Sequence, residues 1–393
     1  MTSLDFDLFD ADHHYYEATD AFTRHLDPKM AKRGMQWAEI DGRTRLLVGG
    51  KVNRFIPNPQ FDPVARPGCL DDYFRGKSSA ADLRQAFGEL EPIHPGYREP
   101  EPRIELLDAQ GVEQCFLFPT LGVGMEEALV DDPEAAHASF EAFNRWLEDD
   151  WGFAHQDRIL AAPYLCLLDP EAALAETERV LEAGARVIVM RAGPVKAPTG
   201  WRSPGDVVYD PVWSAIESAG VPVCYHSGES GYGFLVEAWG ENPEFEAFRR
   251  TPLMGLLQGH RAIQDTIAAL ICHGVFHRFD GIRVATVESG SDWVGPLAAS
   301  LTKLSKQNPA QFADDPIETL REKVWVSPYY EDDITALADV LGVERVLMGS
   351  DFPHAEGIAA PKDYIRDLEG FSDDDVKRIM RTNGVELATP QPR

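Results

Sequence analysis

Short apolar runs rich in β-branched and aromatic residues alternate along the chain with longer segments of helical periodicity. Each apolar run ends in polar residues, glycine or proline, as strands usually do. This alternation is typical of parallel βαβ units, and eight runs suffice to close a barrel, so the pattern predicts an α/β barrel. The predicted strands cover residues 7–14, 113–120, 158–167, 186–193, 221–228, 282–290, 323–330 and 345–354.

The segments between these strands have helical periodicity, as in residues 102–111, 169–184 and 209–220. Each ends on a glycine, and Gly184 and Gly220 lie just before the next strand, as helix C-caps often do. Asp169 and Asp210 each precede a proline, which is the favoured arrangement of an N-cap and the first helical residue. The recurring order of helix, glycine and strand indicates a repeated βα unit.

Two stretches exceed what a minimal barrel needs. Residues 18–100 are rich in proline, and residues 229–280 begin with a glycine-rich segment and continue into long helical patterns. We interpret both as insertions on the catalytic face, within a single domain of residues 1–393, because insertions after barrel strands wall the pocket. A linker between two domains is the alternative for residues 18–100, since prolines also mark linkers.

The composition and net charge of the chain argue against some classes of binding partner. Hydrophobic residues make up 44% of the chain and charged residues 26%, as in globular proteins. The formal net charge of −28 would repel nucleic-acid phosphates and anionic membranes, so we expect neither as a partner. The N-terminus is acidic where a targeting peptide would be basic, and no apolar run is long enough to span a membrane. These features predict a cytoplasmic protein.

The chain has five cysteines, at positions 69, 115, 166, 224 and 272, and none forms a Cys-x-x-Cys pair. Their odd number and mostly apolar surroundings predict reduced residues of the core. We therefore expect neither a disulfide framework nor a structural zinc site.

Polar side chains follow most of the predicted strands at their carboxyl ends. In a barrel these ends meet at one mouth, so the residues there are candidates for a common site. They are Asp12, His13, His14, Arg191, His226, Glu288, Asp351 and His354.

Four of these residues predict a metal site. Asp12 and His14 are two positions apart on one strand, so both side chains point to the same side. His226 and Asp351 follow buried-looking strands elsewhere in the chain. Two imidazoles and two carboxylates form a mixed set of ligands that suits Zn, Mn or Fe. Each residue alone could be structural, but their convergence favours a metal.

Glu288 follows an otherwise apolar strand, so the metal and the substrate are its expected neighbours. It could act as a general base or acid, or bind a second metal ion. The structural alternative is a carboxylate that holds a loop amide.

Four other residues have open roles. His13 alternates with Asp12 and His14 and should point away from them. Glu17 could support a metal ligand or lie on the surface. Arg191 could bind a substrate carboxylate, although pairing with an acid is favoured. His354 could contact the substrate, orient Asp351 or cap a helix.

The chain resembles the amidohydrolase superfamily, in particular the amidohydrolase 2 family that includes aminocarboxymuconate-semialdehyde decarboxylase. The resemblance extends over nearly the whole chain and rests on the order and spacing of six motifs. These are "DADHHYYE", "GVEQCFLFPT", "GARVIVMRAGP", "DPVWSAIESAGVPVCYHSG", "VESGSDW" and "LMGSDFPHAEG".

The resemblance implies a distorted (β/α)8 TIM barrel with long insertions after strands 1 and 5, and metal ligands at Asp12, His14, His226 and Asp351. Two departures matter. The first-strand pair is usually His-x-His, and the aspartate here shifts the preference from Zn toward Mn or Fe. Many members carry histidine where this chain has Glu288. Binuclear relatives often carry a carbamylated lysine where this chain has Arg191, so one ion is favoured over two.

The leading hypothesis is a metal-dependent enzyme that hydrolyses or non-oxidatively decarboxylates a small organic substrate. Asp351 would relay the proton, Glu288 would serve as a second acid or base, and His354 would assist at the site. One alternative is a dinuclear non-haem iron or iron-manganese oxygenase, because carboxylate and histidine ligands suit oxygen activation. The other is a non-catalytic or mononuclear-zinc subunit that partners an active paralogue.

The stretch 251–276 contains more apolar residues than one buried helix face needs. A pair of core helices would explain this, and so would an interface between subunits. We expect a homodimer or a larger oligomer, with a paralogous subunit as the alternative partner.

Overall fold

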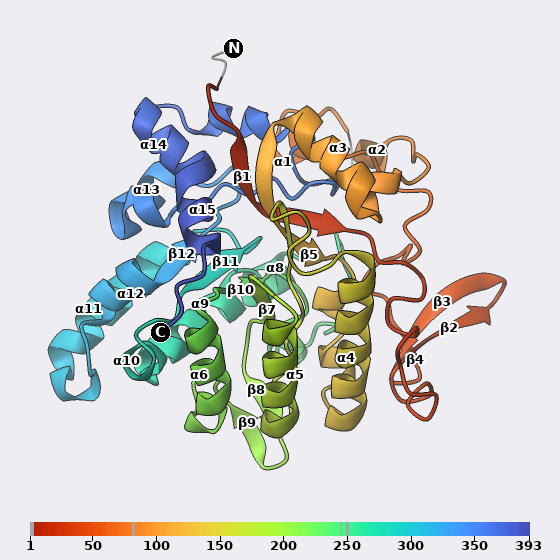
Figure 1. The fold of residues 1–393 in the computed structure, drawn as a ribbon, viewed down its shortest axis with the longest axis horizontal. Helices are drawn as coiled ribbons and strands as arrows, with labels where there is room; N and C mark the ends of the chain where they lie inside the picture. Colours follow the sequence, from red (N-terminus) through yellow and green to blue (C-terminus); the bar gives the residue numbers. More distant parts are fainter. Residues whose placement is uncertain (1–3, 81–82, 245, 249–250) are drawn as a thin grey trace.

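Two parallel sheets form the centre of the computed structural model, which describes residues 4–80, 83–244, 246–248 and 251–393 (Figure 1). The predicted single domain and its insertions also include residues 1–3, 81, 82, 245, 249 and 250, which lie outside these ranges. One sheet has the order β1-β5-β6, with β1 at Leu8–Tyr15, β5 at Val112–Pro119 and β6 at Ile159–Ala161. The other has the order β12-β11-β10-β7, with β7 at Ile188–Arg191, β10 at Val223–His226, β11 at Val284–Val287 and β12 at Val324–Val326.

Isolated parallel bridges extend both sheets. Tyr164 pairs with Val189, which connects the segment after β6 to β7. Val346 pairs with Val326 of β12, and Phe352 pairs with His13 of β1. The segment 346–352 therefore lies between the outer strands of the two sheets.

The prediction of a regular eighth strand over residues 345–354 is wrong. The N–H of Met348 donates to the carbonyl of Ile379, and the N–H of Ser350 donates to the Asp10 carboxylate, so neither joins a strand ladder. Asp351 has a left-handed backbone with φ of 56°, which interrupts extended structure. The other seven predicted strands are present, and those from β6 onward are shorter than predicted.

The predicted helices are present as α3 (Pro100–Gln110), α5 (Pro170–Glu182) and α6 (Asp210–Ala219). The Asp169 side chain accepts hydrogen bonds from the first turn of α5, as expected of an N-cap. The prediction that Asp210 is an N-cap is wrong, because a 3₁₀ turn over residues 207–209 leads directly into α6. The cap belongs to this turn, where the Asp206 side chain accepts from the Val208 N–H.

The remaining helices complete the outer layer. They are α1 (Asp71–Phe74), α2 (Leu83–Phe87), α4 (Pro133–Asp150), α7 (Gly233–Ala238), α8 (Pro252–Gln258), α9 (Arg261–Cys272), α10 (Val275–Arg278), α11 (Val294–Gln307), α12 (Pro316–Lys323), α13 (Ile334–Leu341), α14 (Asp373–Lys377) and α15 (Asn383–Ala388). The apolar stretch 251–276 is thus divided among three helices. Gly274, with φ of 69°, separates the last two of them.

The first predicted insertion contains strands that the sequence pattern did not indicate. An antiparallel sheet of β2 (Met35–Ile40), β3 (Arg43–Val48) and β4 (Lys51–Val52) projects from the body of the molecule (Figure 1). A second hairpin, β8 (Val195–Ala197) with β9 (Gly200–Arg202), follows β7. Among the described residues, none of the helices has the length and hydropathy needed to cross a membrane.

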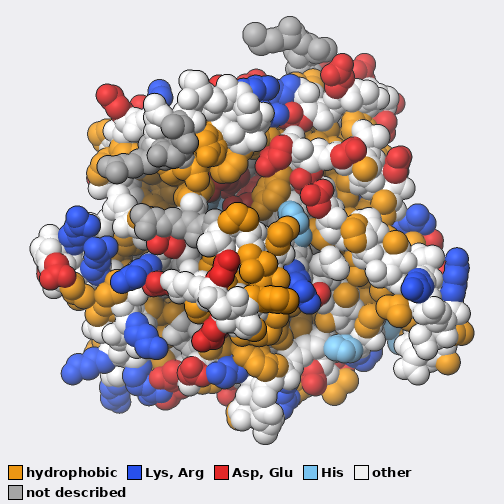
Figure 2. Space-filling model, turned by 180° about the vertical axis from the view of Figure 1, so that it is seen from behind, with side chains coloured by type: hydrophobic (Ala, Val, Ile, Leu, Met, Phe, Trp, Pro, Cys, Tyr) orange, Lys and Arg blue, Asp and Glu red, His pale blue; other side chains and the backbone are white. Residues whose placement is uncertain are grey.

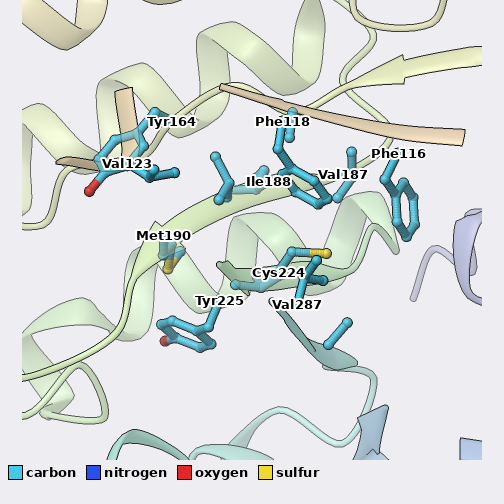
Figure 3. Close-up of a cluster of buried hydrophobic side chains, with 14 of the residues drawn as sticks. Phe116, Phe118, Val123, Tyr164, Val187, Ile188, Met190, Cys224, Tyr225 and Val287 are labelled. Carbon is cyan, nitrogen blue, oxygen red and sulfur yellow. The ribbon is translucent and has the colours of Figure 1, made fainter. Parts of the chain in front are cut away.

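Apolar side chains of β5, β7, β10 and β11 pack together in the core (Figure 3). Three of the five cysteines, Cys115, Cys166 and Cys224, are buried here as predicted. Cys69 is only partly buried, and Cys272 is exposed because it ends α9 on the outer layer, so the prediction of a core position is wrong for Cys272. All five are free thiols.

Candidate metal site

β1 supplies the first two side chains of the site. Asp12 and His14 are 3% and 0% exposed, and the Asp12 Oδ1 atom lies 3.2 Å from His14 Nε2. A register shift between Asp10 and His13 interrupts the pairing of β1 with β5, and the Asp12 N–H donates to the Asp10 carboxylate within it. The strand thus holds both candidate ligands inside the protein, with their donor atoms together.

His226, the last residue of β10, meets this pair. Its Nε2 atom lies 3.1 Å from His14 Nε2 and 3.4 Å from Asp12 Oδ1. Its Nδ1 atom lies 2.8 Å from the Ser227 carbonyl, which can only accept, so Nδ1 carries the proton. In a neutral ring, Nε2 would then be unprotonated and would face Asp12 and His14, as in metal-bound histidines that donate their other N–H to a carbonyl.

The segment after Met348 adds Asp351 and His354. The Asp351 Oδ1 atom lies 3.4 Å from His14 Nε2 and 2.6 Å from His354 Nδ1. The His354 ring stacks on the His14 ring, with 4.0 Å between centroids. Donor atoms of His14, Asp351 and His354 all lie within 4.8 Å of one another, as do those of Asp12, His14 and His226. These two groups share His14, so the structure brings the four predicted ligands together.

Glu288 lies directly after β11, with a left-handed backbone at φ of 49°. Its Oε2 atom is 3.5 Å from His226 Nε2. Carboxylate atoms of Glu288, Asp351 and Glu356 lie within 4.8 Å of one another and form a third group. Glu356 was not predicted, although its position five residues after Asp351 in one loop is a signal that could have identified it.

Burial and neighbouring imidazoles prepare Asp12 and His14 for a cation. Burial lowers the pKa of His14 well below its usual value, so the ring is neutral, which is the form that binds metals. Burial would raise the pKa of Asp12, but hydrogen bonds with His14 and His226 outweigh it and hold this pKa below the usual range.

The carboxylates on the other side of the site repel one another. Burial, reinforced by the charges of Glu356 and Asp12, raises the pKa of Asp351 well above its usual value. Burial and the charge of Asp351 raise the pKa of Glu288 in the same way. A divalent cation would favour the ionised form of these groups, and their mixed nitrogen and oxygen donors fit such an ion.

Arg191 is close to the site and pairs with two acids. Its guanidinium donates to Glu126 at 3.0 Å, to Glu127 at 2.8 Å and to the Pro194 carbonyl at 2.8 Å. This is the pairing with acids that the sequence favoured for Arg191, and the partners are two loop residues after β5. These bonds use three of the five guanidinium N–H groups, and Arg191 also lines the cavity described below, so its contact with substrate stays a prediction.

Three buried residues support the site from behind. His13 points away from the candidate ligands, as predicted, and contacts Asp10 and Arg103. Arg103, which the sequence did not single out, also donates to the carbonyls of His14 and Gly96. Glu17 is buried, so the surface alternative for it is wrong, and its carboxylate accepts from the N–H groups of Leu121 and Gly122.

A cavity of about 250 Å³ reaches the site at His226. Ser289, Gln258 and His260 line it, together with the paired Arg191. Figure 2 shows one face of the molecule, where hydrophobic side chains gather beside a hollow that contains acidic side chains. A small molecule in this cavity would lie against His226.

The chain matches the amidohydrolase family model over residues 10–387. A search of curated proteins finds no match. The crystal structure of the amidohydrolase map2389c from Mycobacterium avium subsp. paratuberculosis K-10 is similar, with 44% identity over 99% of both chains and a TM-score of 0.94.

Two more distant solved structures share the TIM-barrel fold. Dihydroxybenzoic acid decarboxylase from Polaromonas sp. JS666, with bound manganese and an inhibitor, is 18% identical over 81% of this chain and 92% of that one, with a TM-score of 0.56. 5-carboxyvanillate decarboxylase LigW from Sphingomonas paucimobilis is 15% identical over 98% of this chain and 100% of that one, with a TM-score of 0.59.

Proposed function

The chain belongs to the amidohydrolase family of metal-dependent enzymes, and on this basis we propose that it decarboxylates a small organic acid without an oxidant. One observation carries the proposal: donor atoms of Asp12, His14 and His226 lie 3.1–3.4 Å apart, and His226 also lines a cavity. Similarity to decarboxylases with bound manganese supports this choice over hydrolysis.

We propose Asp12, His14, His226 and Asp351 as ligands of one divalent ion, with manganese ahead of iron and zinc because two of the donors are carboxylates. Such an ion would hold the substrate carboxylate and an adjacent oxygen and stabilise the charge that develops there. Glu288 lies beside His226 and directly before Ser289, which lines the cavity, and it would deliver a proton to the carbon that loses carbon dioxide. Asp351 as a proton relay, Arg191 as a substrate contact and His354 as a substrate or proton contact remain predictions.

Hydrolysis is the second candidate function. The three carboxylates of Glu288, Asp351 and Glu356 favour it, because a group of acids beside the ligands could bind a second ion or orient an attacking water. These three carboxylates are also compatible with the iron or iron-manganese oxygenase, in which Glu288 would be a metal ligand.

The proposal also covers the closure of the barrel and the oligomeric state. The bridges at Tyr164, Val346 and Phe352 support a closed, distorted barrel, with residues 18–100 and 229–280 as insertions on its catalytic face. Exposed apolar side chains in the second insertion support a dimer or larger oligomer. Leu256 and Trp239 are 80% and 71% exposed to solvent, and an interface between subunits would bury them. A cytoplasmic location remains a prediction from the acidic N-terminus.

The test measures metal content, carbon dioxide release and oxygen consumption for the purified protein with Mn(II). The substrates are dihydroxybenzoates and 5-carboxyvanillate, and light scattering gives the mass of the assembly. We expect about one ion per chain and carbon dioxide release without oxygen uptake. Oxygen uptake would instead identify an oxygenase, and bound zinc without any turnover would favour a partner subunit.

A further inference from the structure

The tautomer of His354 is fixed by its neighbour Thr120. The Thr120 hydroxyl has one proton, and it donates that proton to the Tyr15 carbonyl at 2.7 Å. The same oxygen lies 2.9 Å from His354 Nε2. Since the hydroxyl proton is already used, Nε2 must be the donor in this contact. In a neutral His354 ring the proton is therefore on Nε2, and Nδ1 presents a lone pair.

The lone pair on His354 Nδ1 lies beside an oxygen of the Asp351 carboxylate. His354 Nδ1 lies 2.6 Å from Asp351 Oδ1, which in turn lies 3.4 Å from His14 Nε2. Within the described part of the chain, neither His354 Nδ1 nor Asp351 Oδ1 makes a hydrogen bond of acceptable geometry. Two buried acceptors at this separation repel each other unless a proton or a metal cation lies between them.

The ring of His354 is also held in place. It stacks on the His14 ring at 4.0 Å with 28° between the planes, and its side chain is 11% exposed. The bond to Thr120 on one side and the stack on the other prevent a turn that would bring Nδ1 into solvent. His354 Nδ1, Asp351 and His14 donor atoms lie within 4.8 Å of one another, a separation that one ion can span.

We propose that His354 is a metal ligand through Nδ1, with Thr120 as the residue that positions it. This inference rests on the proposed metal site and gives His354 a role other than substrate contact or proton transfer. The ion then has three imidazole ligands, from His14, His226 and His354. Thr120 acts on the metal only through the imidazole, by keeping the proton on Nε2.

The experiment counts imidazole ligands and needs no substrate. Pulsed electron paramagnetic resonance of the Mn(II)-loaded protein resolves the coordinated nitrogens, and calorimetry gives the Kd for Mn(II). The variants are His354→Phe, which keeps a stacked ring without a lone pair, and Thr120→Val, which keeps the shape without the hydroxyl. Thr120→Ser is the matched control because it retains the hydroxyl.

We expect three coordinated imidazoles in the wild type and two in His354→Phe, with a Kd raised by about 100-fold or more. Thr120→Val should raise the Kd by about tenfold, and Thr120→Ser should leave it within about twofold. Should His354→Phe fail to fold, the wild-type nitrogen count and the Thr120 pair decide the question. Two imidazoles in the wild type, or equal Kd values for Thr120→Val and Thr120→Ser, would overturn the inference.

These outcomes separate the inference from the proposed function. Three imidazoles without carbon dioxide release would leave His354 a ligand and refute the decarboxylase. Carbon dioxide release with two imidazoles would support the decarboxylase and refute the role of His354.

Discussion

Two buried polar clusters at the strand ends differ in how far their hydrogen bonds are satisfied. In the Arg191 cluster, which comprises Arg191, Glu126 and Glu127, the guanidinium donates to both acids and to a carbonyl. In the metal-site cluster, which comprises Asp12, His14, His226, Asp351 and His354, the Asp351 Oδ1 and His354 Nδ1 atoms have no hydrogen-bond partner among the described residues.

This difference suggests that the Arg191 cluster stabilises the fold, whereas the metal-site cluster serves the proposed reaction. In the sequence, Arg191 and His226 are equivalent, since each is a polar residue at the end of an apolar strand, and their Cα positions pair in register. A satisfied cluster stabilises the fold, whereas buried acceptors that face one another favour a proton or a cation between them. Substitutions in the two clusters should therefore affect different properties.

The largest effect is expected for His226→Ala or Asp351→Asn, which remove a proposed ligand. Metal content should fall below stoichiometric levels, and turnover should fall by about 1,000-fold or more, because the ion supplies several kcal/mol of stabilisation to the transition state. Elemental analysis and steady-state kinetics measure the two quantities. Full metal content and activity in both variants would refute the metal site.

Arg191→Met should instead reduce stability. It leaves the buried Glu126 and the half-buried Glu127 without this cation, which costs about 3–5 kcal/mol of unfolding free energy. Urea unfolding measures this change, and metal content should not change. Arg145→Met is the control, since its pair with Glu141 is exposed and worth about 1 kcal/mol or less. A normal stability with a raised KM would favour the substrate contact predicted for Arg191.

The Glu288→Gln substitution tests whether Glu288, which lies beside the metal-site cluster, delivers a proton or binds a metal ion. The amide keeps the shape of the side chain but cannot deliver the proton, so kcat should fall by about 100-fold while one ion per chain stays bound. Glu356→Gln is the comparison, because Glu356 belongs to the same group of acids without contacting His226 in the structure. If both variants reduce the metal content from two ions to one, Glu288 is a ligand rather than an acid.

The smallest effect concerns Glu17, which is buried behind the site and accepts two backbone N–H groups at one carboxylate oxygen, Oε1. Burial raises the pKa of Glu17 from 4.5 to about 7. Between these values the folded protein keeps a proton that the unfolded chain has released, so this contribution is complete below pH 4.5 and is lost as the pH rises through 7.

Glu17→Gln cannot ionise, so its unfolding free energy should fall less between pH 5 and 7.5 than that of the wild type, by up to about 3 kcal/mol. Thermal unfolding across this range measures the difference. Glu105→Gln, at an exposed position on α3, should behave like the wild type. An unchanged pH profile in Glu17→Gln would show that its carboxyl group titrates alike in both states.

The alternation of strands and helices was enough to predict how the four proposed ligands meet. Asp12, His14, His226 and Asp351 each follow or belong to an apolar strand, and parallel strands bring such ends to one edge. The prediction of a regular eighth strand was wrong because Met348 and Ser350 donate their N–H groups to the Ile379 carbonyl and the Asp10 carboxylate. The left-handed backbone of Asp351 interrupts the strand as well, and none of these contacts has a signal in the apolar pattern.

Partners supplied by loops and helices could not be predicted in the same way. Thr120, Arg103 and Glu356 carry no periodic signal, because their roles depend on where a loop or a helix face lies relative to β1. The acids that pair with Arg191 are in the loop after β5, and the sequence gives no spacing that relates them to β7.

The order in which the ribosome makes the chain has a consequence for the site. Asp12 and His14 emerge first and His226 midway, whereas Asp351 and His354 emerge near the end. A nascent chain that lacks the last segment also lacks the residues that lie between β12 and β1, and with them two residues of the metal-site cluster. Under the proposed ligand set such a chain would bind the ion weakly, so we expect truncated products to remain metal-poor.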